Sequence, residues 1–525
     1  MMLSHNPIVE PFALAHATIV TGDKAGTILR NMTIVVGADG RIEQVAPSIE
    51  TSIPAEYHYL DGTGKIVMPG LINAHTHLFS QGKPLNPKLA TPKGQRMVAT
   101  FAHSPLGKPY MAATVKHNAT TLLESGVTTI RTLGDVGYEV VTLRDQIDAG
   151  QILGPRILAS GPLMAIPEGH GAPLIALTSG TPEEARTAVA QNLKAGVNAI
   201  KIAATGGVTD AQEIGEAGSP QMSVEQMRAI CDEAHQYGVI VGAHAQSPEG
   251  VRRSLLAGVD TIEHGSVLDD ELIGMFRHNP NALRGYSALI PTLSAGLPLT
   301  LLGQDVTGIT DIQLENSKNV VGGMVSGARQ AHEAGLMIGV GTDTGMTFVP
   351  QYATWRELEL LVAYAGFSPA EALHAATAVN ASILGVDAET GSWKSANPLI
   401  ACAECQSAGR PARVGTPGTG HRGRHPVWRP GPKRFRGYRR PVGRGIRLIA
   451  GSCRAVMPAG HCPTCVARWG HGENSSERTG NRGARRRLVF ERRAHQGTVR
   501  TSVEGATRRR THRARRHIGR PICLR

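Results

Sequence analysis

The stretch MPGLINAHTHLFS, residues 68–80, runs from an apolar segment directly into His75 and His77. Residues i and i+2 of a β-strand point to the same side, so a strand that ends this way presents two imidazoles together. A lone histidine at a strand end is most often a core or loop residue, whereas a His-x-His pair is equally well explained as two metal ligands. For this stretch alone both interpretations stay open, and four further places in the chain bear on the choice.

The length and composition of the chain limit its class. Its 525 residues exceed one ordinary domain and suit a large α/β barrel with additional segments. Since the sequence has no run of roughly 18 or more apolar residues, we expect no membrane span. The N-terminus lacks a basic segment followed by an apolar one, so we expect a cytoplasmic protein. Only Cys231 lies before residue 400, which excludes a disulfide framework there.

The formal net charge of +13 is the sum of two parts of the chain with opposite net charge. Residues 1–400 carry 25 Lys+Arg against 37 Asp+Glu, whereas residues 401–525 carry 30 against 5. The chain therefore consists of an acidic body and a strongly basic tail.

The pattern of apolar residues predicts three parts. Residues 1–67 contain short alternating strands with a hairpin at NMTIVVGADGRI, which indicates a small β-domain. Residues 68–390 alternate apolar strands with capped helices, which predicts an α/β fold with a parallel sheet and, with eight such units, a (β/α)₈ TIM-like barrel. Residues 391–525 form the basic tail. The expected barrel strands are 68–74, 127–133, 156–161, 199–203, 239–243, 260–263, 287–292 and 338–342.

Helix signals between these strands support the barrel. Thr181 precedes a proline and a helical run that Gly196 ends, and Ser223 and Gly238 bound the next helix in the same way. A final helix is expected over residues 368–385.

Catalytic residues of such barrels lie at the carboxyl ends of the strands. Each of five expected strands carries a polar side chain there that suits metal chemistry, namely His75, His77, Lys201, His244, His264 and Asp343. Neutral imidazoles and carboxylates are ligands of Zn²⁺ and similar ions. A buried lysine can lose its proton and react with carbon dioxide, and the resulting carbamate is a carboxylate that can bridge two ions. Taken singly, Lys201 could be an ordinary strand lysine and Asp343 a turn residue, but the recurrence favours a metal site.

The motifs MPGLINAHTHL, AIKIAATGG, GAHA, IEHG and GTD resemble those of the amidohydrolase superfamily, in particular its imidazolonepropionase-like and Xaa-Pro dipeptidase (prolidase) branch. The resemblance covers about residues 10–393. It implies two divalent metal ions, with zinc expected, and a carbon dioxide-derived carbamate on Lys201. Mononuclear members lack the strand-4 lysine, so its presence favours the binuclear, peptide-cleaving branch. The ligands implied are the four histidines, Lys201 and Asp343.

The implied reaction is hydrolysis of a C–N bond. A hydroxide that bridges two metals would attack an amide carbonyl, and Asp343 would pass the proton to the departing amine. The expected substrate is a small molecule such as an Xaa-Pro dipeptide or an N-acyl amino acid. Hydrolysis of a cyclic amide or deamination with one metal is the alternative within enzymes, and an inactive relative is another. A homo-oligomer is compatible with the sequence.

Weaker signals surround this set. His170, in PEGHGAP, is a candidate to bind the substrate or stabilise developing negative charge, or a plain loop histidine. Arg131 could bind a substrate carboxylate or pair with Asp135. The glycine-rich segment 205–223 could be a lid or a simple excursion of the chain.

The basic tail allows three interpretations. Its 29 arginines could bind nucleic acid, but it shows no recognisable fold, so we do not expect this partner. Two Cys-x-x-Cys pairs, Cys402/Cys405 and Cys462/Cys465, could bind zinc, but the 56 residues between them exceed the usual spacing. We favour the third interpretation, a disordered segment translated out of frame, because Asp disappears while Arg, Gly and Pro accumulate. The expected small β-sandwich would then lack its C-terminal strands.

Overall fold

The computed structural model describes residues 10–84, 91–172 and 174–393, and the predictions for the tail from residue 394 onward lie outside the described residues. The strands are β1 (Phe12–Val20), β2 (Ile28–Val36), β3 (Ile42–Pro47), β4 (His58–Asp61), β5 (Ile66–Val67), β6 (Leu71–Thr76), β7 (Val127–Thr132), β8 (Arg156–Leu158), β9 (Leu163–Ala165), β10 (Ala176–Thr178), β11 (Ala199–Ala203), β12 (Ile240–Ala245), β13 (Thr261–His264) and β14 (Ala288–Ile290). The α-helices are α2 (Pro92–His103), α3 (Gly107–Glu124), α4 (Glu139–Asp148), α5 (Pro182–Lys194), α6 (Val224–His235), α7 (Pro248–Ala257), α8 (Asp270–Arg277), α9 (Leu293–Leu301), α10 (Gln304–Thr307), α11 (Asp311–Glu333), α12 (Thr354–Tyr364), α13 (Pro369–His374) and α14 (Asn380–Leu384).

The N-terminal strands form one five-stranded sheet. β1 pairs antiparallel with β2, and β2 pairs antiparallel with β3 through the hairpin that the sequence predicted. β4 and β5 both pair parallel with β1. The buried face of β1 and β2 carries alternating apolar residues that form a separate core. The second layer of a β-sandwich stays a prediction.

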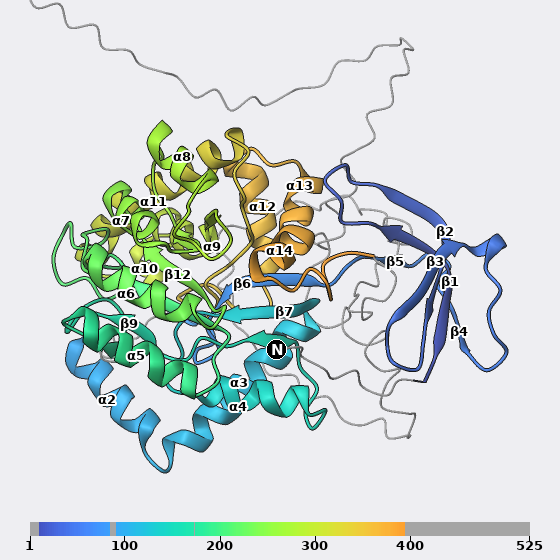
Figure 1. Ribbon diagram of the computed structural model, residues 1–525, viewed down its shortest axis with the longest axis horizontal. Helices are drawn as coiled ribbons and strands as arrows, with labels where there is room; N and C mark the ends of the chain where they lie inside the picture. The colour runs from blue at the N-terminus through green and yellow to red at the C-terminus, as the bar shows by residue number, and fades with distance from the viewer. Residues whose placement is uncertain (1–9, 85–90, 173, 394–525) are drawn as a thin grey trace, which may run out of the picture. The chain divides into compact units, whose positions relative to one another are not determined.

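The strands from β6 onward pair only in parallel (Figure 1). They form the orders β6-β7-β8 and β10-β9-β11-β12-β13-β14. Ala159, just after β8, accepts a 2.7 Å hydrogen bond from Asn198 N, just before β11. On the other side, Val340 accepts a 2.9 Å bond from Ala74 N of β6, while Gly339 N donates to Leu289 of β14. This mixed α/β arrangement fits a TIM-like barrel.

The capping residues act as the sequence predicted. The side chain of Thr181 accepts from Glu184 N at the start of α5, and Ser223 forms a reciprocal capping box with Gln226 at the start of α6. The helix expected over 368–385 has a one-turn π segment at Ala375–Val379 between α13 and α14.

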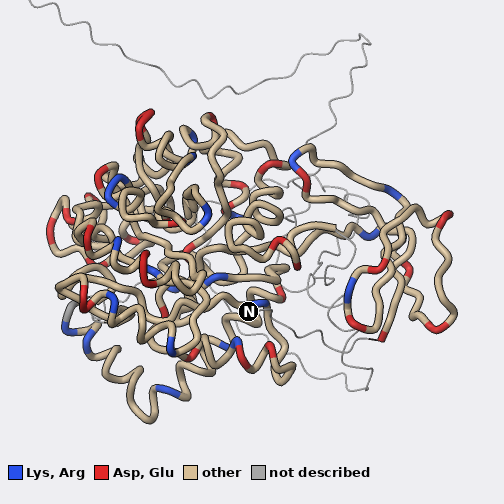
Figure 2. The backbone as a smooth tube through the Cα atoms, viewed as in Figure 1, with Lys and Arg blue, Asp and Glu red and all other residues tan. Residues whose placement is uncertain are grey.

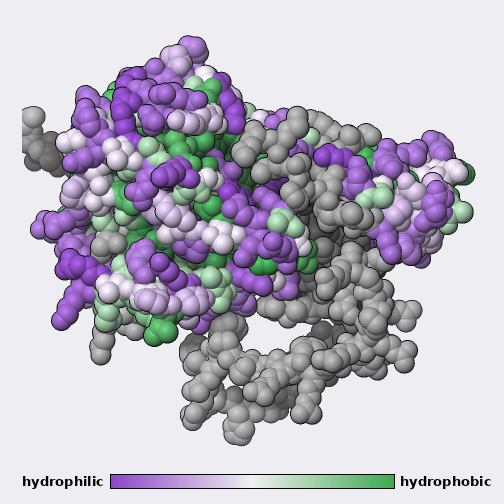
Figure 3. All heavy atoms as spheres, turned by 60° about the horizontal axis from the view of Figure 1, so that its bottom comes forward, coloured by the Kyte–Doolittle hydropathy of each residue, from purple (hydrophilic) through white to green (hydrophobic). Residues whose placement is uncertain are grey.

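Charged residues of both signs are spread along the described chain (Figure 2). The face drawn in Figure 3 is mainly hydrophilic with separate hydrophobic areas. Among the large apolar side chains that are exposed are Met97, Phe101, Leu106 and Tyr110, on or between α2 and α3. No helix in the described part of the chain has the length and apolar character needed to cross a membrane.

Candidate metal centre

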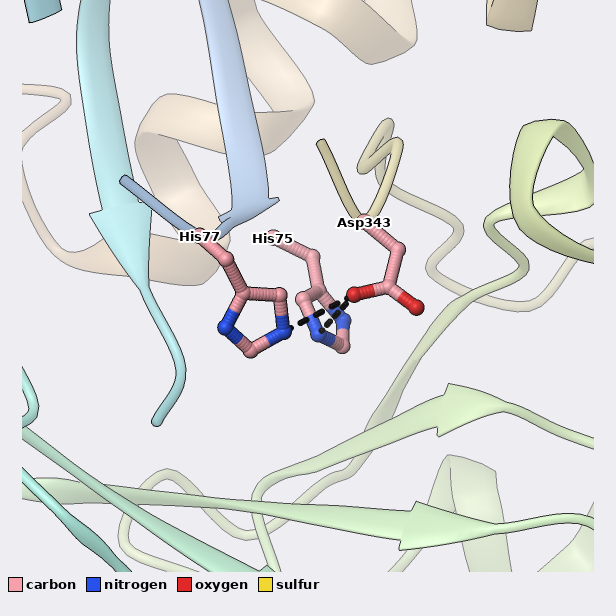
Figure 4. A group of neighbouring side chains, drawn as sticks. All are labelled: His75, His77 and Asp343. Carbon is pink, nitrogen blue, oxygen red and sulfur yellow. Dashed lines mark ion pairs between the residues drawn. The ribbon is translucent and has the colours of Figure 1, made fainter. Parts of the chain in front are cut away.

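Three of the predicted ligands converge at the ends of β6 and of the segment around residue 340. The side chains of His75, His77 and Asp343 point toward one another (Figure 4). Asp343 Oδ1 lies 2.9 Å from His77 Nε2 and 3.4 Å from His75 Nε2, yet it accepts no well-aligned hydrogen bond. Within the described residues, this is the one group of three or more such side chains whose ligand atoms all lie within 4.8 Å of one another. The group fits a divalent metal ion, because it offers two imidazole nitrogens and a carboxylate oxygen that accepts no hydrogen bond from the described residues.

Hydrogen bonds to the other ring nitrogens orient both imidazoles. His75 Nδ1 lies 2.8 Å from Glu263 Oε2, and His77 Nδ1 lies 2.9 Å from the Gly134 carbonyl oxygen. Since each acceptor requires a proton on Nδ1, the Nε2 atom of each neutral ring carries the lone pair. Metal-ligating histidines are commonly held by such a second hydrogen bond.

His264 and His244 continue the group of histidines. The ring centre of His264 lies 5.3 Å from that of His75 and 4.5 Å from that of His244. His264 Nδ1 contacts Thr292 Oγ1 at 2.6 Å, which leaves Nε2 for a ligand. His244 Nε2 lies 3.3 Å from the Gly206 carbonyl oxygen, so Nδ1 is its available nitrogen. Both side chains are buried.

Lys201 lies in the middle of β11, and its side chain is only 3% exposed. Its Nζ has no hydrogen-bond partner among the described residues. Burial lowers the pKa of Lys201 to about 8, while the charges of Glu263 and Asp343 oppose this shift. An unpaired buried ammonium is costly, so a site that converts this amine to another species is chemically reasonable.

Electrostatics keep the imidazoles neutral. Burial, as the largest cause, moves the pKa of His75 and His244 well below the usual value and lowers the pKa of His264 to about 4. Burial would raise the pKa of Asp343, but His75, His77 and His264 together lower it. At neutral pH His75, His244 and His264 are therefore unprotonated and Asp343 is ionised, which are the forms that bind metals.

The backbone at three residues at or just beyond the ends of barrel segments adopts left-handed conformations. The φ angles of His264, Thr292 and Asp343 are 70°, 49° and 60°. Such conformations are unfavourable for residues other than glycine and persist where the surroundings hold them. They turn the side chains of these residues away from the regular alternation of a strand, which sequence periodicity cannot predict.

His170 lies beside this group. Its ring centre is 4.2 Å from that of His244, and its Nδ1 lies 2.9 Å from both carboxylate oxygens of Asp210. Burial would lower the pKa of His170, but Asp210 raises it. A Cβ atom at Gly207 would lie 2.3 Å from the His170 ring, so glycine is required there for this approach. Asp210 was not singled out in the sequence, although it lies in the segment 205–223.

Arg131 is placed differently from either expectation. It is fully buried, and its guanidinium donates to Glu263 Oε1 at 2.8 Å, to Thr261 Oγ1 at 3.0 Å and to the Ala74 carbonyl at 2.7 Å. It forms no pair with Asp135, whose carboxylate accepts from Thr132 and Gly161 N. Because each guanidinium nitrogen donates a hydrogen bond in the protein interior, we infer that Arg131 holds Glu263 in place rather than binding a substrate.

Glu263 is another residue of the candidate site that the sequence analysis did not single out. Its carboxylate joins Arg131 to His75 Nδ1 and is inaccessible to solvent. A Cβ atom at Gly242 would lie 2.8 Å from Glu263 Oε1, so the glycine on the neighbouring strand makes room for this carboxylate. The sequence signal that could have identified Glu263 is a glutamate within the otherwise apolar stretch TIEHG. A charged side chain that is buried in such a strand requires a partner.

Comparison with known proteins agrees with this geometry. The model of the amidohydrolase family matches residues 66–394. The chain belongs to the amidohydrolase family. The predicted superfamily is thus confirmed, and with it a hydrolase that acts on carbon–nitrogen bonds.

Two solved structures resemble this chain. A protein of Bifidobacterium longum proposed to be a prolidase is 89% identical, covers 75% of this chain and 88% of its own, and superimposes with a TM-score of 0.66. A Xaa-Pro dipeptidase with bound methionine in the active site is 26% identical, covers 74% of this chain and 92% of its own, and has a TM-score of 0.62.

Two curated sequences are also similar to this chain. Ochratoxinase of Aspergillus niger is 26% identical over 388 residues, which are 69% of this chain and 74% of the relative. Imidazolonepropionase of Deinococcus deserti is 25% identical over 394 residues, which are 70% of this chain and 86% of the relative. These neighbours support the imidazolonepropionase-like and prolidase branch of the superfamily.

Proposed function

We propose that this protein is a binuclear metal-dependent amidohydrolase that cleaves an Xaa-Pro dipeptide or a related N-acyl amino acid. The observation that carries the proposal is the convergence of His75, His77 and Asp343, together with the electrostatic interaction of Lys201 with His75 and Asp343. Lys201 Nζ is buried and has no hydrogen-bond partner among the described residues. Neutral histidines and an ionised aspartate suit a first ion, and His244, His264 and a modified Lys201 suit a second. We also propose that the parallel strands close into a complete eight-stranded barrel around this site.

Lys201 would hold both ions as a carbamate. The neutral amine attacks carbon dioxide, a C–N bond forms, and one proton is released to solvent. A pKa of about 8 leaves on the order of a tenth of this amine neutral at pH 7, far more than for an ordinary lysine. The product carries a carboxylate that suits two cations.

The remaining residues would bind substrate and move a proton. When bound, the metal ions would activate water as a nucleophile and polarise the substrate carbonyl. Asp343 would accept the proton of the attacking water and donate it to the departing amine nitrogen, as general acid–base chemistry requires. His170, held by Asp210, would donate a hydrogen bond to the substrate through Nε2.

The substrate class rests on relatives. The 89% identity to a proposed prolidase and the likeness to a Xaa-Pro dipeptidase both favour dipeptides that end in proline. Ochratoxinase and imidazolonepropionase indicate how varied the amides of this family are. A one-metal cyclic-amide hydrolase or deaminase is the second candidate, because only His75, His77 and Asp343 form a compact ligand group in the described chain.

The test combines metal analysis with a substrate panel. Purified full-length protein should contain two equivalents of divalent metal and should hydrolyse Xaa-Pro dipeptides faster than Pro-Xaa dipeptides, N-acetyl amino acids or cyclic amides. Lys201→Ala should lose most activity and bind less metal, and added short carboxylates should restore part of both. Lys194→Ala, which changes an exposed lysine on α5, is the matched control and should behave as the wild type.

Three outcomes would contradict the proposal. Full activity in Lys201→Ala would exclude the carbamate. One equivalent of metal with turnover of a cyclic amide would favour the second candidate. Wild-type protein that binds no metal and hydrolyses no amide would be an inactive relative.

A further inference from the structure

Thr292, between β14 and α9, determines which nitrogen of His264 is protonated. Its hydroxyl lies 2.8 Å from the Pro291 carbonyl oxygen and 2.6 Å from His264 Nδ1. A hydroxyl has one hydrogen, and a carbonyl can only accept, so the hydroxyl donates to Pro291 and accepts from His264 Nδ1–H. The lone pair of the neutral imidazole therefore lies on Nε2.

Thr292 makes this contact from an unfavourable backbone conformation. Its φ and ψ are 49° and 45°, a left-handed geometry that is rare for a β-branched residue. Thr292 also occupies the position that normally caps a helix, here α9, but its side chain makes no capping hydrogen bond. The hydroxyl is engaged by His264, so the first N–H groups of α9 need another acceptor.

Glu357 of α12 supplies that acceptor. One carboxylate oxygen accepts from Leu293 N at 2.7 Å, and the other accepts from Ser294 N at 2.7 Å and from Ser294 Oγ at 2.6 Å. The side chain is inaccessible to solvent. These bonds fix the two residues that directly follow Thr292.

Burial makes the ionised carboxylate of Glu357 energetically unfavourable at this position. Burial raises the pKa of Glu357 to about 7, although the hydrogen bonds from Ser294 and Leu293 oppose the shift. The positive end of α9 also favours a negative charge. An apolar residue would pack the same space without a desolvation cost, so packing alone does not explain a glutamate here.

Helix α12 is also connected, through Asn73, to the predicted ligand His75. Thr354, three residues before Glu357, accepts a 3.0 Å hydrogen bond from Asn73 Nδ2. Asn73 Oδ1 in turn accepts from the backbone N of His75 at 3.2 Å. One turn of α12 is thus connected to two of the predicted ligands on different strands.

We propose that Glu357 is a positioning residue of the metal centre. It caps α9 in place of Thr292, holds Thr292 in its left-handed conformation, and thereby directs the Nε2 lone pair of His264 to the metal. This inference rests on the proposed metal centre and adds a residue that touches neither metal nor substrate.

The test measures metal affinity in Glu357→Gln, with Glu359→Gln as the matched control on the exposed face of the same helix. Glutamine has one acceptor oxygen and places an amide donor against backbone donors of α9. Chelator competition at pH 8 should show metal binding weakened roughly 10–100-fold, the range for supporting groups of metal ligands. Excess metal should restore kcat, which a general folding defect would not allow. Glu359→Gln should match the wild type.

Thr292 variants keep the inference testable if Glu357→Gln fails to fold. Thr292→Ala should weaken metal binding as Glu357→Gln does, whereas Thr292→Ser, which keeps the hydroxyl, should recover most of the affinity. The double variant Glu357→Gln/Thr292→Ala should bind metal no more weakly than either single variant, because both act through His264. If the wild type and Glu357→Gln bind metal equally well, this inference alone is wrong. If the wild-type protein binds no metal, both the proposed centre and this inference are wrong.

Discussion

Glu263 and His264 are neighbours in β13, yet both lie against His75 of the candidate metal centre. Adjacent side chains of a regular strand point to opposite faces, so a periodic pattern assigns only one of them to the site. The left-handed φ of 70° at His264 breaks the alternation, and Glu263 contacts His75 while the His264 ring lies beside the His75 ring. The candidate site therefore obtains one predicted ligand, His264, and the support of another, His75, from two consecutive positions.

Glu263→Gln tests this support. The change leaves Arg131 buried without its carboxylate, and breaking a buried ion pair typically costs about 3–5 kcal/mol of unfolding free energy. It also weakens the acceptor of His75 Nδ1, so metal affinity should fall roughly 10–100-fold. Urea unfolding and chelator competition measure the two effects. Glu271→Gln, which loosens an exposed pair with Arg252, should change stability by less than about 1 kcal/mol; equal effects of both changes would refute the assignment.

The titration of His264 should affect the stability of the metal-free protein. Burial lowers its folded-state pKa from 6.5 to about 4. Below pH 6.5 the unfolded chain therefore binds more protons than the folded chain, and this residue destabilises the fold increasingly down to about pH 4, with no effect above 6.5. At pH 5, which is 1.5 units below the unfolded-state pKa, the unfolding free energy is lower by about 2 kcal/mol, at about 1.4 kcal/mol per unit.

The titration of Glu357 changes the unfolding free energy in the opposite direction. Because its folded-state pKa is raised from 4.5 to about 7, this residue stabilises the fold increasingly as the pH falls from 7 to 4.5. The His264 effect is consequently measured as a difference. Between pH 7.5 and 5, the unfolding free energy of chelator-treated His264→Asn in urea should rise by about 2 kcal/mol relative to that of the wild type, because the variant lacks the destabilising imidazole. A constant difference would show that His264 titrates normally.

The sequence predicted the elements of the fold well and their ends less well. The predicted strand 199–203 coincides with β11, and the caps Thr181 and Ser223 were correct, because apolar runs and capping residues are local signals. The predicted strand 338–342 pairs mainly through backbone bonds to β6 and β14 and forms no regular strand. Left-handed strand ends and the π turn at Ala375–Val379 depend on tertiary contacts that no local pattern contains.

The same limit applies to the site. His-x-His and strand-end residues predicted the group of His75, His77 and Asp343 that the structure brings together. The contacts of Glu263, Glu357 and Asp210 join segments far apart in sequence, so spacing could not show them.

The segment 205–223 is attached to α11, which bears on whether it is a lid. Asn316 Oδ1 accepts from Gly215 N at 3.1 Å and from Ala217 N at 3.0 Å, and its Nδ2 donates to the Glu213 carbonyl at 2.8 Å. These bonds favour a fixed excursion of the chain over a mobile lid.

Asn316→Ala should release this segment. Three hydrogen bonds of about 1 kcal/mol each are lost, so hydrogen exchange of peptides that cover residues 213–217 should accelerate roughly 10-fold or more. Lys318→Ala, an exposed change two positions further along α11, should leave the exchange rate unaltered. Unchanged exchange in Asn316→Ala would mean that other contacts hold the segment.

At the scale of the whole molecule, the family match and the charge distribution divide the chain at nearly the same place. The amidohydrolase match ends at residue 394, and the sequence turns strongly basic after residue 400. All six predicted ligands and Glu357 precede this point. The catalytic function is therefore expected to reside in the acidic body alone.

Limited trypsin digestion tests this division. From its composition, with sparse apolar residues and 30 Lys+Arg among residues 401–525, the tail is predicted to form no packed domain and to be cut rapidly. The acidic body should resist, because its lysines and arginines lie in a folded unit. Mass measurement should find a product that ends near residue 394, and this product should retain the metal content and the amide hydrolysis of the intact protein. A tail that survives as a protected fragment with cooperative unfolding of its own would contradict the out-of-frame interpretation and favour the nucleic-acid or zinc alternatives.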